Sequence, residues 1–247
     1  EEETKFFIIS KGIMDIVDED DSSSSRMGSV GRGNNVGIGE GAGSAINTGS
    51  HNVAVGHEAL NSATSESGQV AIGYKALADI HTNGTNTAIG YKAGKGITSG
   101  ASNIAIGYEA FDKGTTGYDS IAIGNNCLDS GSAYTGYYNT IVGNASGRNI
   151  TSAICNTVFG RGALATETAA STNTAVGFEA LKTQNGGHGN TAVGSSAGDA
   201  VTTGDYNTHI GEQAGGAANT ASNNTTLGAS AGNTITTSSQ NTVLGQG

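Results

Sequence analysis

Tyrosine side chains gather at two places in this sequence, and aromatic rings of this kind form platforms on which sugars often bind. Three of them stand at equal intervals along the chain: Tyr74, Tyr91 and Tyr108. Three more lie within one short stretch: Tyr134, Tyr137 and Tyr138. If the chain recognises a ligand, we expect these six residues to bind it. The competing interpretation of the first group is a ladder of like side chains that only stabilises the stack.

Acid–base, nucleophilic and metal chemistry find no comparable support. The five histidines show no metal-ligand spacing on a common register. No nucleophile–base pair or pair of carboxylates converges in the sequence pattern. The two cysteines, Cys127 and Cys155, are too few for a disulfide framework and lack a C-x-x-C spacing. The sequence therefore predicts no enzyme, no cofactor and no metal, and we expect Cys127 to be a small buried thiol.

A strict sequence repeat must position all of these side chains. A glycine that follows an apolar residue, here called the reference glycine, recurs thirteen times: Gly39, Gly56, Gly73, Gly90, Gly107, Gly124, Gly143, Gly160, Gly177, Gly194, Gly211, Gly228 and Gly245. Every reference glycine is the seventeenth residue after the one before it, except Gly143, which is the nineteenth after Gly124. A constant period of about 20 residues is typical of stacked repeat architectures. We call the residues from one reference glycine to the next a coil.

Each coil contains one short strand that ends at the reference glycine. The residue three before the glycine is always β-branched and the residue one before it is Ile, Val, Leu or Phe. Side chains alternate along a strand, so these two rows share a face, and we expect that face to point inward. The residues two before the glycine, here called the Ala row, should then point outward: Ala54, Ala71, Ala88, Ala105 and Ala122.

Two further rows predict contacts between coils. Asn stands four before the glycine in eleven of the thirteen coils, and stacked amides can hydrogen-bond from coil to coil. Ala stands three after the glycine in ten coils, which predicts a second inward row. The rest of the coil indicates turns and a weaker second strand. At about 4.8 Å between stacked strands, thirteen coils make a rod roughly 60 Å long.

Charged side chains also repeat. Two after the glycine stand Glu58, Lys75, Lys92 and Glu109 in successive coils. We expect Glu58 to pair with Lys75 and Lys92 to pair with Glu109, on a solvated face where each pair contributes at most ~1 kcal/mol.

The repeat unit resembles a known one. The segment Asn86-Thr87-Ala88-Ile89-Gly90-Tyr91-Lys92-Ala93-Gly94 is similar to repeats of the YadA-like head domains of trimeric autotransporter adhesins, and still more to repeats of phage and marine-virus tail-fibre proteins. The resemblance covers residues 33–247. It implies an all-β, left-handed parallel β-roll, a β-solenoid of about thirteen coils, that assembles as a homotrimer. We then expect the Ala row, which includes His209 at the equivalent position, near the threefold axis.

The chain divides into two parts. Residues 33–247 form the repeat domain, whereas residues 1–32 do not repeat. Within them, residues 6–9 and 13–17 predict a hairpin, and the acidic, Ser-rich stretch 18–25 predicts a linker. The repeat is interrupted shortly after Gly245, and we expect the chain to be one segment of a longer protein.

Composition limits the partners. The 247 residues include 41 Gly and no Pro, and their net charge is −10 with no cluster of Lys or Arg, so we expect no nucleic-acid partner. No apolar run reaches the length of about 18 residues that a membrane-spanning helix needs, so we expect no membrane insertion.

The leading hypothesis is a structural and adhesive fibre segment on the surface of a virus particle. Its partners are then copies of itself, further parts of the fibre or virion, and a glycan or protein on the host surface. The alternative is the head of a bacterial trimeric adhesin on the cell surface, which is also extracellular. A third class is an ice-binding protein, suggested by the Thr row that runs from Thr140 to Thr242. This class ranks lowest of the three because we expect the row to point inward, away from ice.

Overall fold

The computed structural model describes residues 6–10, 13–17, 33–82 and 84–247, and every strand of the repeat lies within them. Two strands precede the repeat, β1 (Phe6–Ser10) and β2 (Ile13–Val17), which pair antiparallel as the predicted hairpin. The predicted linker, 18–25, lies outside the described residues. The repeat contributes one strand per coil: β3 (Val36–Ile38), β4 (Val53–Val55), β5 (Val70–Ile72), β6 (Thr87–Ile89), β7 (Ile104–Ile106), β8 (Ile121–Ile123), β9 (Thr140–Val142), β10 (Thr157–Phe159), β11 (Thr174–Val176), β12 (Thr191–Val193), β13 (Thr208–Ile210), β14 (Thr225–Leu227) and β15 (Thr242–Leu244).

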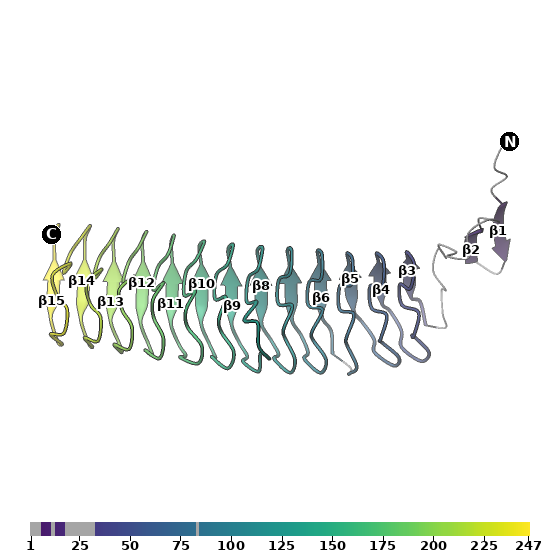
Figure 1. Cartoon of the computed structure of the whole chain (residues 1–247), viewed down its shortest axis with the longest axis horizontal. Helices are drawn as coiled ribbons and strands as arrows, with labels where there is room; N and C mark the ends of the chain where they lie inside the picture. Colours follow the sequence, from purple (N-terminus) through teal and green to yellow (C-terminus); the bar gives the residue numbers. More distant parts are fainter. Residues whose placement is uncertain (1–5, 11–12, 18–32, 83) are drawn as a thin grey trace.

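The repeat is a parallel β-solenoid, as predicted. Strands β3 to β15 form one 13-stranded sheet in sequence order, and Figure 1 shows them side by side along a rod with the turns between them. Each strand residue pairs with its equivalent one coil later, as Val70 does with Thr87, and only the step from Ile121 to Thr140 is longer. No helix occurs in the described residues. The weaker second strand is reduced to isolated bridges, such as that between Tyr118 and Tyr137.

A ladder of buried amides joins the coils, which confirms the interpretation of the Asn row. Asn173 is typical, because its side-chain oxygen accepts from the backbone N–H of Asn190 at 2.8 Å and its Nδ2 donates to the carbonyl of Gly187 at 3.0 Å. Its own N–H donates to Asn156 Oδ1 at 2.8 Å. The amide thus finds its partners in the neighbouring coils, as a buried polar group requires.

The Ala row points into the core, and the two rows on either side of it point outward. The predicted orientation of the strand is therefore wrong. The middle residue of each strand of the interior coils is buried, and the Ala row is at most 1% exposed. The β-branched and large apolar rows point outward instead. The cause is the narrow cross-section, since a Cβ added at Gly94 on the opposite wall would lie 3.4 Å from the Cβ of Ala88. Side chains on the two walls are therefore already in van der Waals contact where the strand residue is as small as Ala88.

Three of the larger inward residues, Ile141, His209 and Thr226, face a glycine on the opposite wall. Ile141 takes a position where most coils have Ala, and a Cβ at Gly147 would lie 2.8 Å from its Cδ1. Thr226 faces Gly232 in the same way, with a corresponding separation of 2.6 Å. The second predicted inward row, three after the reference glycine, is confirmed by the burial of Ala59, Ala76 and nearly all of their equivalents. The core is therefore filled by complementary small and large residues along the rod.

Cys127 belongs to this second inward row and is the buried thiol predicted from the sequence. It is fully buried and donates to the carbonyl of Ile141 at 3.3 Å. Burial raises the pKa of its thiol to about 12, whereas Cys155 is exposed. At about pH 8 only roughly one Cys127 in ten thousand is then ionised, and the thiolate is the reactive form.

We expect a thiol-modifying reagent at about pH 8 to label Cys155 and leave Cys127 unmodified in the folded chain. Peptide mass spectrometry measures the two sites separately. In the unfolded chain both should react. Equal labelling of both cysteines in the folded chain would contradict the buried position of Cys127. Cys127→Ala should fold normally, because Ala fills the equivalent position in ten other coils.

Candidate functional site

The first tyrosine group forms a continuous stack, as its spacing predicts. The ring centroids of Tyr74 and Tyr91 are 5.0 Å apart, and those of Tyr91 and Tyr108 are also 5.0 Å apart, with interplanar angles of 11° and 6°. His57 extends the stack, its ring 5.4 Å from that of Tyr74. The inner rings cover one another, so the stack offers its edges along the rod, and free ring faces only at its two ends. A sugar could lie flat on an aromatic ring only at those ends.

Charged side chains border this stack in the predicted pairs. Lys75 Nζ lies 2.9 Å from a carboxylate oxygen of Glu58, and Lys92 Nζ lies 3.1 Å from Glu109 Oε1. The hydrogen bond to Glu58 raises the pKa of Lys75, and the same bond lowers the pKa of Glu58. The two ammonium groups also lie 5.4 and 5.1 Å from the ring centroids of Tyr74 and Tyr91. These contacts stabilise the ladder, which supports the structural interpretation of the stack.

The second tyrosine group is divided between core and surface. Tyr134 is fully buried, packs edge-on against Phe111 at 4.8 Å, and shares its hydroxyl with Ser120 and Asn139. The prediction that Tyr134 takes part in surface recognition is therefore wrong. Glycines leave room for its ring inside the coil, because a Cβ added at Gly136 would lie 2.9 Å from its Cζ. Tyr138 is exposed and packs edge-on against the stacked pair Tyr118 and Tyr137.

The outward side of the sheet is a candidate contact surface, here called the strand face. It consists of two rows, the residues three before and one before each reference glycine. Several large apolar members are more than a third exposed: Val36, Ile38, Ile72, Ile89, Phe159, Val193, Ile210, Leu227 and Leu244. The Thr row lies on this face as well, so its expected inward position is also wrong. The strand face runs along all thirteen strands without a charged side chain.

A groove lies on a different side of the rod, along the turns that follow the strands. Small residues form its floor where other coils carry larger ones. Two after the reference glycine stand Ala145 and Gly162, although the four coils from Glu58 to Glu109 have a long charged residue there. Ala165 lies beside them, and the cavity has a volume of about 470 Å³. Two small residues in successive coils thus open a concave site on an otherwise regular rod.

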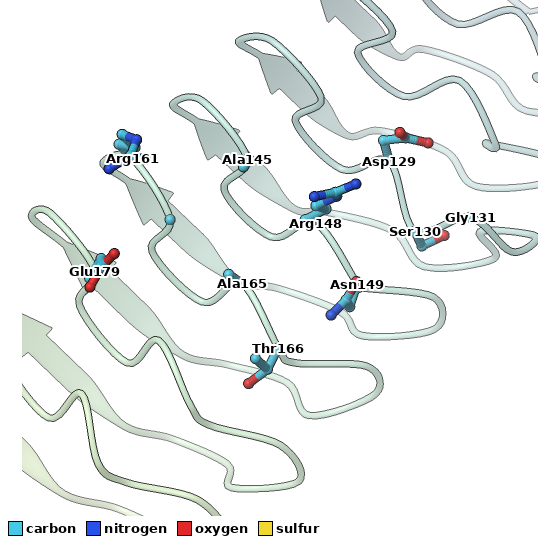
Figure 2. Close-up of a pocket in the computed structure, with 11 residues that line it drawn as sticks. Asp129, Ser130, Gly131, Ala145, Arg148, Asn149, Arg161, Ala165, Thr166 and Glu179 are labelled. Atoms are coloured by element: carbon cyan, nitrogen blue, oxygen red, sulfur yellow. The ribbon is translucent and has the colours of Figure 1, made fainter.

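Charged and polar side chains border the groove. Figure 2 shows Arg148 and Arg161 on neighbouring coils, with Asp129 on the coil before them and Glu179 on the coil after them. Among the described residues, neither guanidinium has a carboxylate oxygen within 4.0 Å. The Arg161 guanidinium lies 5.5 Å from the ring centroid of Phe178. Sequence reasoning missed this site, although the adjacent small residues two after the glycine were a readable signal.

Some kinds of site are not found in the described part of the chain. No group of three His, Cys, Asp or Glu side chains there could hold a metal ion. None of its segments is a helix long and apolar enough to cross a membrane. His209 is buried in the core with its Nδ1 2.9 Å from Thr226 Oγ1, so it does not line the outer surface where copies of the chain could meet.

The comparisons with known proteins found no match. No protein-family model matches the chain, and no curated protein or solved structure matches it either.

Proposed function

We propose that this chain is a rod-shaped segment of a fibre that assembles with copies of itself through the strand face. The fibre belongs to a virus particle and contributes to its attachment to a host cell. The observation that supports assembly is the outward position of the large apolar row, which exposes Ile38, Ile72, Ile89 and their equivalents along the sheet. Soluble monomers rarely leave a continuous apolar stripe of this length in water.

The resemblance to viral fibres and adhesin heads supplies the finer parts of the proposal, a homotrimer and a left-handed winding. With the Ala row in the core, the strand face takes its place near the threefold axis. The face is uncharged, and the rod is about 60 Å long at the usual strand spacing. Burial of apolar area at roughly 25 cal/mol per Å² favours the closure of such a face against a copy of itself.

We expect the chain to be a trimer at micromolar concentration, measured by light scattering coupled to size exclusion. Replacing Ile89, Ile123 and Val176 together by Glu should give a folded monomer. These side chains point outward and lie in coils that do not touch, so the added charges enter the interface without stacking on one another. Circular dichroism confirms that the variant still folds.

Phe178→Glu is the matched control, because Phe178 is a similarly exposed aromatic residue that lies outside the strand face. It should leave the trimer intact. A monomeric parent chain, or a triple variant that assembles as the parent does, would contradict assembly through the strand face.

The head of a bacterial trimeric adhesin is the alternative, and it requires the same assembly. A coiled-coil stalk and membrane anchor encoded in the same reading frame would favour the adhesin. A virion-binding domain or a self-cleaving chaperone domain there would favour the virus.

Ice binding is the second candidate, and the outward Thr row favours it. Seven successive coils carry Thr three before the reference glycine, with an apolar residue beside each of them on the same face. A flat, regular array of hydroxyl and methyl groups is a surface suited to ordered water. A monomer that shows thermal hysteresis in dilute solution would replace the fibre proposal with this one, since an ice-binding face must stay free.

A further inference from the structure

We infer that the groove between Asp129 and Glu179 binds an acidic saccharide, a sugar unit with one carboxylate or sulfate. This goes beyond assembly, because the groove lies on the turns, away from the strand face. The biological role of this binding rests on the proposed function in host attachment. The binding itself is a property of the single chain.

The two guanidinium groups indicate an anionic ligand. Arg148 and Arg161 are the arginines of the described residues, and both lie at this groove in a chain whose net charge is −10. The described lysines of the turns mostly have carboxylate partners, as Lys182 does with Glu179 at 2.9 Å. The two arginines have none, so their planar N–H forks remain available to a carboxylate or sulfate. The contact with Phe178 restrains the Arg161 side chain before any ligand arrives.

The remaining border indicates a sugar. Ser130 and Thr166 offer hydroxyl groups and Asn149 offers an amide. Asp129 lines the groove too, and its Oδ2 accepts only a long hydrogen bond, from Asn126 Nδ2 at 3.4 Å. A carboxylate at the border of the groove is an acceptor for a ligand hydroxyl, and sugar hydroxyls both donate and accept. The volume of about 470 Å³ lies within the range of small-molecule sites, ~300–1,000 Å³.

The carboxylates also exclude other anions. Asp129 and Glu179 stand on either side of the two arginines, and they would repel a polyphosphate or a nucleic-acid backbone. A ligand with one negative charge and several hydroxyls fits both the arginines and the acceptors. This combination separates an acidic sugar from a simple anion, which has no hydroxyl to donate to the Asp129 carboxylate.

The test uses the full 247-residue chain on an array of neutral, sialylated, uronate-containing and sulfated saccharides. Titration calorimetry then gives the Kd of the saccharide bound best. We expect binding to acidic saccharides alone. Arg148→Gln and Arg161→Gln should each weaken it by about 10- to 100-fold, as the loss of a charge-assisted hydrogen bond does. Asp129→Asn should weaken it as well, although the change favours anions, because the hydroxyl acceptor loses its charge.

Two further variants distinguish binding in the groove from a general attraction of anions to positive charges on the chain. Lys95→Gln removes one positive charge at the repeat position that Arg148 occupies, but outside the groove, and should leave the Kd unchanged. Ala165→Gln fills the groove without a change of charge and should weaken binding as the arginine variants do. No binding to any acidic saccharide would overturn the inference. So would equal losses with Lys95→Gln, or inorganic sulfate that binds as tightly as the saccharide. None of these results bears on the assembly of the strand face.

Discussion

Gly160→Ala should lower the free energy of unfolding of the chain by more than about 3 kcal/mol. The backbone of Gly160 has φ +144°, which side chains of L-residues rarely adopt. A Cβ built there would also lie 2.5 Å from the carbonyl carbon of Gly177 in the next coil. The coil cannot retreat, because the backbone N–H of Gly177 donates to the carbonyl of Phe159 at 2.7 Å. Urea unfolding followed by circular dichroism measures the loss.

Two other glycines allow the cost of the strained backbone to be measured apart from the cost of contact between neighbouring coils. Gly186 has φ +108° with no atom within 4 Å of an added Cβ, and Gly245 is a reference glycine with the same open space. Gly186→Ala and Gly245→Ala should therefore cost only about 1–2 kcal/mol, the cost of the backbone alone. If Gly160→Ala cost no more than these two, the backbone angle rather than the stacking of coils would explain the glycine in every coil.

The constant period of the reference glycine was sufficient to predict the sheet, its parallel register and the absence of helices in the repeat. Each coil repeats the same strand, so residues such as Val70 and Thr87 must pair if the coils stack. The buried amide ladder could be predicted for the same reason. Local spacing determines this kind of contact, because every partner lies one coil away.

The orientation of the strand could not be predicted from hydrophobicity. Large apolar residues normally point inward, but in this narrow coil the small residue Ala88 is buried and the larger Ile89 is exposed. The Asn row was the better guide to which face of the strand is buried. Asn86 and Ala88 lie two residues apart and therefore share a face, and a ladder of amides that bond from coil to coil is buried. The same error placed the Thr row inside the coil, where it counted against ice binding.

The sites also depended on where residues point. Tyr134 stands beside Tyr137 and Tyr138 in the sequence, yet its ring fills the core while Tyr138 stays outside. The groove depends on what is missing from a row, namely a long side chain at Ala145 and Gly162. A repeat pattern shows which residues stack, whereas a cavity depends on the residues that fail to fill the stack.

The stability of the chain should fall by roughly 3 kcal/mol between pH 7 and pH 4 because of His209. Its ring is fully buried, and burial lowers its pKa from the ordinary value of 6.5 to about 4. Nε2 has no hydrogen-bond partner, so nothing in the core compensates a second proton. The folded chain therefore keeps the ring neutral while the unfolded chain takes up a proton. The stabilisation is complete above about pH 6.5 and is lost progressively as the pH falls to about 4.

The prediction concerns the difference between two pH profiles, measured by urea unfolding from pH 7 to pH 4. His209→Ala restores the residue that most coils have at this position and removes the titrating group, so its profile should be flatter than that of the parent by roughly 3 kcal/mol. The constant cost of the cavity shifts its whole profile without a change of slope. His81→Ala is the matched control, because His81 is exposed, and it should keep the slope of the parent. If the His209→Ala profile ran parallel to that of the parent, the ring of His209 would have to take up its proton in the folded chain, and its place in the core would be refuted.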